Sequence, residues 1–145
     1  MFGIIVGTHG QFAPGIVQSC EMIFGKRDKL KAVTLMPGEG PDDVIAKYQK
    51  AIEELGNPDR VLFFNDLMGG SPYNAACRLV AENKNYAIVA GVNLPGLIAM
   101  SAAQDMDDGT ATIDELAMQA YEACKDGVAI SSYESLNVES DDDEL

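Results

Sequence analysis

Short apolar runs alternate along this chain with longer segments in which apolar residues recur at helical spacing. The runs have the length of buried strands and lie at residues 2–7, 31–36, 60–66 and 86–91. Helices are predicted at about 11–24, at about 42–55, in the segments that begin at Ser71 and Asn93, and at about 112–126. Four repeats of a strand followed by a helix predict a parallel sheet covered on both faces, because parallel strands need crossover connections.

The order of these strands follows from the handedness of the crossovers. Right-handed connections onto both faces require the strand order to reverse beside the first strand, which predicts the order 2-1-3-4 and a crevice between strands one and three. A further run, "VAISSY" at 128–133, is predicted to form a fifth, edge strand. We therefore expect one α/β domain with a doubly wound, mostly parallel sheet over residues 1–135, and a disordered acidic tail at 136–145.

Two of the helix starts carry a recognisable signal. Ser71 directly precedes Pro72, and Asn93 lies two residues before Pro95. Serine and asparagine cap helix N-termini through their side-chain oxygens, and proline is favoured in the first turn. We therefore predict that Ser71 and Asn93 are N-cap residues.

The chain is strongly acidic. Its 145 residues carry a formal net charge of -13. Nucleic acids and anionic membranes need a positive field, so neither is expected as a partner, and a protein with a basic face suits the chain better. No apolar run approaches the roughly 18 residues of a membrane span. The distant, odd-numbered Cys20, Cys77 and Cys124 favour free thiols in a reducing compartment, so we expect a cytoplasmic protein.

The most informative residues follow the first and third predicted strands. "THG" places His9, the one histidine of the chain, directly after the first strand. "NDLMGGSPYN" places Asp66, Gly69, Gly70 and Ser71 after the third. Because the carboxyl ends of neighbouring parallel strands meet at the same edge of a sheet, we expect these residues to share one crevice.

Together these residue types fit a transient phosphohistidine. An imidazole, with an ordinary pKa of about 6.5, is a neutral nucleophile near pH 7. Asp66 can hold one ring nitrogen as N–H and stabilise the cation formed on attack. Gly69, Gly70 and Ser71 at a helix start can offer hydrogen-bond donors to phosphoryl oxygens.

No lysine or arginine directly follows a strand. The absence of such a cation favours transfer of the phosphoryl group to an acceptor over tight binding of it. Neither a metal nor an organic cofactor is expected.

Each of these features also has a structural explanation when it is taken alone. A lone histidine after a strand is often held by a structural hydrogen bond, an aspartate there often caps a turn, and "GGSP" is a good helix start. A flavodoxin-like regulatory module in which His9 only caps a loop is therefore an alternative. The joint placement of the residues in one crevice favours a functional His9.

Four segments resemble one protein family. They are "GIIVGTHGQFAPGIVQSCEMIFG", "AVTLMPGEGPDD", "VLFFNDLMGGSPYNAA" and "YAIVAGVNLPGL". They are similar to the mannose-family (mannose, fructose and sorbose) IIA component of the bacterial phosphoenolpyruvate-dependent sugar phosphotransferase system. The phosphotransfer subunit of dihydroxyacetone kinase systems has a similar domain and is a second alternative, although "GGSP" and "GVNLP" favour the sugar system.

The resemblance implies a role for each site residue. His9 would accept a phosphoryl group on Nε2 from the phosphocarrier protein HPr and pass it to a IIB component. Asp66 would hold Nδ1, and Gly70 and Ser71 would bind phosphoryl oxygens. The family also implies a homodimer in which the last strand, here near 128–133, is exchanged between subunits and lies antiparallel.

The chain departs from the family pattern in two respects. Family members often carry threonine or leucine followed by tryptophan where this chain has Leu67 and Met68, a difference that bears on the affinity for partners. Some members also continue into a fused IIB domain. Here we expect the IIB component to be a separate chain.

Overall fold

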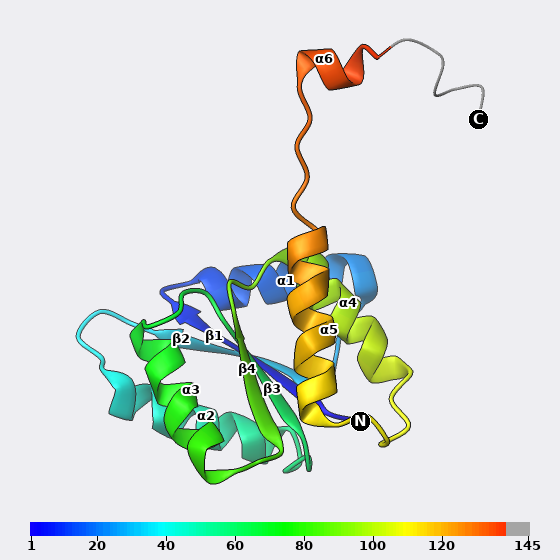
Figure 1. The fold of residues 1–145 in the computed structure, drawn as a ribbon. Helices are drawn as coiled ribbons and strands as arrows, with labels where there is room; N and C mark the ends of the chain where they lie inside the picture. Colours follow the sequence, from blue (N-terminus) through cyan, green and yellow to red (C-terminus); the bar gives the residue numbers. More distant parts are fainter. Residues whose placement is uncertain (139–145) are drawn as a thin grey trace.

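The computed structural model describes residues 1–138. They form three layers, a central sheet with helices on each of its two faces (Figure 1). The four strands are parallel in the order β2-β1-β3-β4, which confirms the prediction. They are β1 (Gly3–His9), β2 (Leu30–Leu35), β3 (Val61–Asn65) and β4 (Tyr86–Ala90). The helices are α1 (Phe12–Phe24), α2 (Pro41–Glu54), α3 (Ser71–Glu82), α4 (Leu94–Asp105), α5 (Ile113–Asp126) and the short α6 (Tyr133–Leu136).

Helices cover both faces of this sheet. Helices α1, α4 and α5 lie on one face, and α2 and α3 lie on the other (Figure 1). Side chains of the central strands alternate between the two cores, so that Ile4 and Val6 pack on the first face and Ile5 on the second. Burying each such side chain contributes about 1.5–3 kcal/mol. The central strands β1 and β3 are therefore held from both sides.

Strand β1 extends further than β3 at the carboxyl edge of the sheet. The last pair between the two strands is Gly7 with Asn65. Strand β1 continues for two more residues to His9, which pairs with Leu35 of β2. His9 therefore lies beyond the last β1–β3 pair, beside the point where the chain leaves β3.

The two predicted helix caps have different outcomes. Asn93 caps α4 as predicted, because its Oδ1 accepts the N–H of Gly96 at 2.9 Å. The prediction for Ser71 is wrong: Gly70 occupies the N-cap position of α3, with φ −73° and ψ 168°, and Ser71 is the first helical residue. Glycine fills an N-cap position without a side-chain bond, so α3 begins one residue earlier than the serine suggested.

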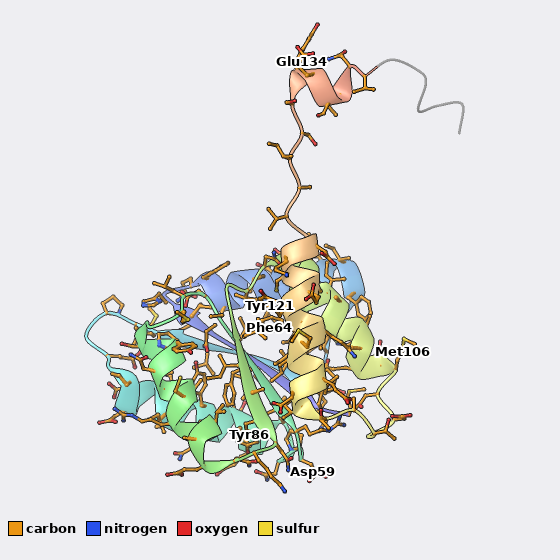
Figure 2. All side chains as sticks on the ribbon, in the orientation of Figure 1. Asp59, Phe64, Tyr86, Met106, Tyr121 and Glu134 are labelled. Atoms are coloured by element: carbon orange, nitrogen blue, oxygen red, sulfur yellow. The ribbon has the colours of Figure 1, made fainter. Side chains whose placement is uncertain are left out.

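The fifth strand predicted at 128–133 is not part of the sheet in this chain. After α5 ends, residues 127–132 leave the body without strand pairing, and α6 forms a single turn beyond them (Figure 1). Figure 2 shows Glu134 of α6 well apart from the side chains of the body. A strand forms only against a partner, so its exchange between two subunits stays a prediction. Of the predicted tail, residues 139–145 lie outside the described residues.

Candidate active site

His9 and Asp66 meet at the carboxyl edge of the sheet, between β1 and β3. His9 Nδ1 lies 2.9 Å from Oδ2 of Asp66. The main-chain N–H of His9 donates to the same oxygen at 3.0 Å. The side chain of His9 is 47% exposed, whereas that of Asp66 is 15% exposed. The carboxylate is thus largely shielded, and the imidazole faces solvent.

This contact sets the orientation of the imidazole ring. A carboxylate accepts hydrogen bonds and cannot donate them, so Nδ1 carries the hydrogen toward Asp66. The other ring nitrogen, Nε2, then holds its lone pair on the side away from the carboxylate. The second oxygen of Asp66, Oδ1, is buried and makes no hydrogen bond with any residue that the structure describes. This arrangement leaves the lone pair of Nε2 free to act as a nucleophile.

Gly70 brings the start of α3 against the imidazole. A Cβ atom at this position would lie 3.4 Å from Nε2 of His9 and only 2.7 Å from its Cε1, and the second distance is shorter than real Cβ atoms show. The backbone of Gly70 has an ordinary negative φ, so space and not torsion requires glycine here. Its neighbour Gly69 has φ +87°, the left-handed region that favours glycine. Gly70 is thus required by the lack of space for a Cβ, and Gly69 by its backbone conformation.

The first turn of α3 presents unpaired donors at this place. The N–H of Gly70 donates to the Leu67 carbonyl at 3.2 Å and is engaged in the turn. The N–H groups of Ser71 and Tyr73 make no hydrogen bond with a described residue, and neither does the Ser71 hydroxyl. Unpaired N–H groups and the helix dipole give such a start a partial positive charge, which favours an anion.

The sequence profile described as "PTS system fructose IIA component" matches residues 3–117 of the chain. The chain belongs to this family. It is 37% identical over 125 residues to the mannose-specific EIIAB component of Escherichia coli K12, which covers 86% of this chain. The chain spans only 38% of the length of that relative. It is also 31% identical to the fructose-specific EIIA component of Bacillus subtilis, with both chains fully covered.

Solved structures of IIA components have the same fold. The phosphotransferase system component EIIA from Streptococcus agalactiae superposes with a TM-score of 0.79 at 26% identity, covering 90% of this chain and 97% of that one. The mannose/sorbose-specific IIA subunit from Enterococcus faecalis gives a TM-score of 0.77 at 26% identity, with coverages of 90% and 94%. These similarities bear out the α/β architecture and the resemblance drawn from the motifs.

In this IIA-family chain the sequence-derived site residues fall in one place. The imidazole of His9 lies beside both Asp66 and Gly70, as expected for residues that share one crevice. Gly69 and Ser71 flank Gly70 along the chain, with Ser71 opening α3. Ser71 does not cap the helix, and its hydroxyl makes no hydrogen bond with a described residue, so this hydroxyl can donate to an added acceptor.

Sequence reasoning missed three buried polar residues beneath the site. Thr8 accepts the N–H of Ala13 on its Oγ1 at 2.7 Å and so closes the turn between β1 and α1. Tyr48 and Asn65 are fully buried and hydrogen-bonded to each other at 3.0 Å. Tyr48 belongs to the apolar stripe of α2, so the sequence indicates only that its side chain is part of the core. The sequence did carry a signal for Asn65: a polar residue at the end of the most hydrophobic strand is expected to be buried and to need a hydrogen-bond partner.

Two other kinds of site are not found among residues 1–138. No three His, Cys, Asp or Glu side chains gather there in a way that would hold a metal ion. No helix of this part of the chain has both the length and the apolar character needed to cross a bilayer.

Proposed function

We propose that this IIA-family chain is a phosphocarrier in sugar uptake. Nε2 of His9 takes a phosphoryl group from phosphorylated HPr and passes it to a IIB component. One observation carries the proposal: His9 Nδ1 is held by Asp66 at 2.9 Å while its ring stays half exposed beside the start of α3. A histidine that only capped a loop would not need a half-exposed ring beside a helix start.

The reaction is an exchange of one N–P bond for another. The lone pair of His9 Nε2 attacks the phosphorus carried by HPr, and the electron pair of the broken N–P bond returns to the imidazole of HPr. His9 then carries a positive ring with Nδ1–H still bound to Asp66, whose negative charge stabilises it. In the second step the nucleophile of IIB attacks the same phosphorus, and the bonding pair returns to Nε2.

Weak anion binding at α3 suits a carrier. The N–H groups of Ser71 and Tyr73 and the Ser71 hydroxyl are the donors within reach of this turn, together with the helix dipole. A dipole at a helix start favours an anion by about 0.3–1 kcal/mol, rising to about 2 kcal/mol when the site is partly buried. Among the described residues no lysine or arginine pairs with Asp66. The phosphoryl group is therefore stabilised without being trapped.

An exposed apolar rim around His9 supports docking of the two protein partners. Leu67 and Met68 are 60% and 73% exposed, and Phe12 and Met36 are also exposed. Such a rim on a chain of net charge -13 fits a partner with an apolar patch inside a basic face. Because one imidazole serves both transfers, donor and acceptor use this rim in turn.

The segment after α5 supports a homodimer with an exchanged strand. Strand β4 pairs with β3 on one side only. A groove beside its other side is lined by apolar and aromatic residues that include Met68, Tyr73, Met118 and Tyr121. Residues 128–132, which precede α6, form neither helix nor strand and expose Val128 and Ile130, apolar side chains that suit such a groove on a second copy.

Incubation with phosphoenolpyruvate, enzyme I and HPr tests the phosphocarrier function. Intact mass measurement should show the gain of one acid-labile phosphoryl group on the wild-type chain, and this gain should disappear in His9→Ala. Circular dichroism of His9→Ala should match the wild type, since the side chain is half exposed. A wild-type chain that gains no mass, or a variant that still gains it, would refute the proposal.

A further inference from the structure

A chain of buried hydrogen bonds runs beneath the candidate active site. The hydroxyl of Tyr48, on α2, donates to the carbonyl of Pro72 at 2.9 Å and accepts an N–H of Asn65 Nδ2 at 3.0 Å. The second N–H of Asn65 Nδ2 donates to the carbonyl of Gly7 at 2.8 Å. One phenol thus ties together α2, α3, β3 and β1.

Each end of this network lies next to a residue of the site. Gly7 is two residues before His9 in β1, and Asn65 directly precedes the carboxylate that holds the imidazole. Pro72 lies in the first turn of α3, the turn whose glycine touches the imidazole. The carbonyl of Asn65 also accepts the N–H groups of the next loop, at Gly91 and the residue after it. The network therefore connects every segment that carries the site.

Gly7 makes the space that this network needs. A Cβ on Gly7 would overlap the hydroxyl of Tyr48 and would lie 2.7 Å from its Cε1 and Cζ atoms. The strand backbone itself would accept a larger residue at this position. The bare Cα of Gly7 thus lets the phenol reach through to Asn65.

Two features distinguish the network from a core hydroxyl that has merely found a partner. A carbonyl in the first turn of a helix already accepts the N–H four residues on, so α3 does not need Tyr48 to complete its own bonds. A phenylalanine would fill the same volume against Phe63, whose ring stands edge-on at 5.0 Å, without burying a polar atom. The hydroxyl is an addition that packing does not require.

The hydroxyl of Tyr48 also keeps its hydrogen. Burial raises the pKa of Tyr48 well above its usual value, the hydrogen bond from Asn65 opposes this, and the charge of Asp66 adds to the rise. The phenol therefore stays protonated near neutral pH and donates its hydrogen to the carbonyl of Pro72.

We propose that Tyr48, through Pro72 and Asn65, is a positioning residue for phosphoryl transfer at His9. It holds the first turn of α3 at the distance from the imidazole that lets its N–H groups meet the phosphoryl oxygens in transit. The inference rests on the proposed phosphocarrier function. It assigns a role to a residue that never touches the phosphoryl group.

Tyr48→Phe tests this directly, because it keeps the ring and removes only the hydroxyl. In single-turnover transfer from phosphorylated HPr, the rate at saturating HPr should fall by about 10- to 100-fold, because small displacements of reacting groups cause rate losses of this size. The HPr concentration that gives half the maximal rate should stay within about twofold, because the apolar rim around His9 is untouched. A residue of purely structural importance would not separate these two quantities.

Tyr86→Phe is the matched control. The ring of Tyr86 also packs edge-to-face against Phe63, with ring centroids 5.9 Å apart, and its hydroxyl makes no hydrogen bond with a described residue. It begins β4, at the sheet edge away from His9 and near Asp59 (Figure 2). Transfer by this variant should match the wild type.

A second measurement needs no transfer at all. In the unphosphorylated proteins, the amide resonances of Ser71 and Tyr73 and the ring resonances of His9 should shift in Tyr48→Phe and stay in place in Tyr86→Phe. If Tyr48→Phe proves too unstable, phosphorylation of the wild type should shift the side-chain amide resonances of Asn65.

The outcomes separate the two proposals. A wild-type chain that accepts no phosphoryl group removes the phosphocarrier function, while the amide shifts still test the positioning of α3. A wild-type chain that is phosphorylated, with Tyr48→Phe transferring within twofold of it, overturns the role of Tyr48. So does an equal loss in Tyr86→Phe, which would reflect the packing of Phe63 alone.

Discussion

One carboxylate oxygen binds both the main chain and the imidazole of His9. Oδ2 of Asp66 accepts both Nδ1–H and the main-chain N–H of His9, at 2.9 and 3.0 Å. The ring cannot turn about χ1 or χ2 without losing the first of these bonds. Because Asp66 is largely shielded from water, its attraction for the ring cation is screened less than at an open surface. The same contact orients the ring and places a carboxylate where a positive charge on the ring would be stabilised.

Replacing Asp66 with asparagine should separate shape from charge. Asp66→Asn keeps the volume of the side chain but loses the negative charge that, in the proposed mechanism, stabilises the phosphorylated ring. We expect the fold to persist and transfer from HPr to slow by about 10²- to 10⁴-fold, the range for a histidine that loses its orienting carboxylate. Stopped-flow or quench measurements with phosphorylated HPr give the rate. An unchanged rate would remove the role assigned to the carboxylate.

Gly70→Ala tests the close approach of α3 to the imidazole. The added methyl group would lie 2.7 Å from Cε1 of His9, so the ring or the turn must move. We expect transfer to slow by about 10- to 100-fold, with a small change in stability, because the half-exposed ring can yield toward solvent. Gly40→Ala is the control, since Gly40 is also an N-cap glycine with negative φ but has open space around its Cα. Equal activity of the two variants would contradict the account.

At the scale of elements, the strands and their order could be predicted because burial dictates both. The four apolar runs predicted as the parallel strands were confirmed, and right-handed crossovers left one strand order. The proximity of His9 and Asp66 followed from that order, since both lie at carboxyl ends. The Tyr48 network could not be foreseen, because helical periodicity indicates that a side chain is buried and not what its hydroxyl contacts. The run at 128–133 has strand composition but finds no partner in its own chain.

The opposite edge of the sheet is held by Asp107, in the loop between α4 and α5. Its Oδ2 accepts the N–H of Phe2 at 3.0 Å and pairs with Arg60 at 2.5 Å, and its Oδ1 accepts the N–H of Gly109 at 3.1 Å. Burial by itself would raise the pKa of Asp107, but the bonds from Arg60, Gly109 and Phe2 outweigh it and lower the pKa. The carboxylate thus ties the starts of β1 and β3 to this loop.

Asp107→Asn should lower the free energy of unfolding by about 2 kcal/mol at pH 7, because Arg60 is left without its charge partner. The native pKa of Asp107 lies below the unfolded value, so this contribution is present above about pH 4 and is lost as the pH falls through the native pKa. Urea unfolding of wild type and variant should therefore converge in acid. Asp59→Asn, which changes an exposed aspartate without an ion pair to a described residue, is the control. A difference between wild type and Asp107→Asn that stays constant down to pH 3 would contradict this explanation.

At the scale of the whole molecule, the described segment after α5 does not pack against the rest of its own chain (Figure 1). Val128 and Ile130 are exposed there, and Ile130 is 92% exposed. An isolated chain would gain by burying them, and the open side of β4 on a second copy offers hydrogen bonds as well as apolar surface. Exchange of the segment would satisfy both copies at once, in a symmetric pair.

Truncation separates this segment from the acidic residues that follow it. A chain ending at Gly127 should be monomeric by sedimentation or light scattering, whereas the full chain should be dimeric. A chain ending at Val138, which removes only residues 139–145, should remain dimeric. If the chain ending at Gly127 still forms the same dimer, the exchanged strand is not what joins the subunits.

The central claim is that His9 carries the phosphoryl group on Nε2 while Asp66 keeps the hydrogen on Nδ1. Nitrogen NMR of the histidine ring, recorded before and after phosphorylation by HPr, tests it most directly. We expect Nδ1 to be protonated in both states and Nε2 to show coupling to phosphorus in the second. Phosphorus coupled to Nδ1, or a ring unchanged while the protein gains a phosphoryl group elsewhere, would contradict the account.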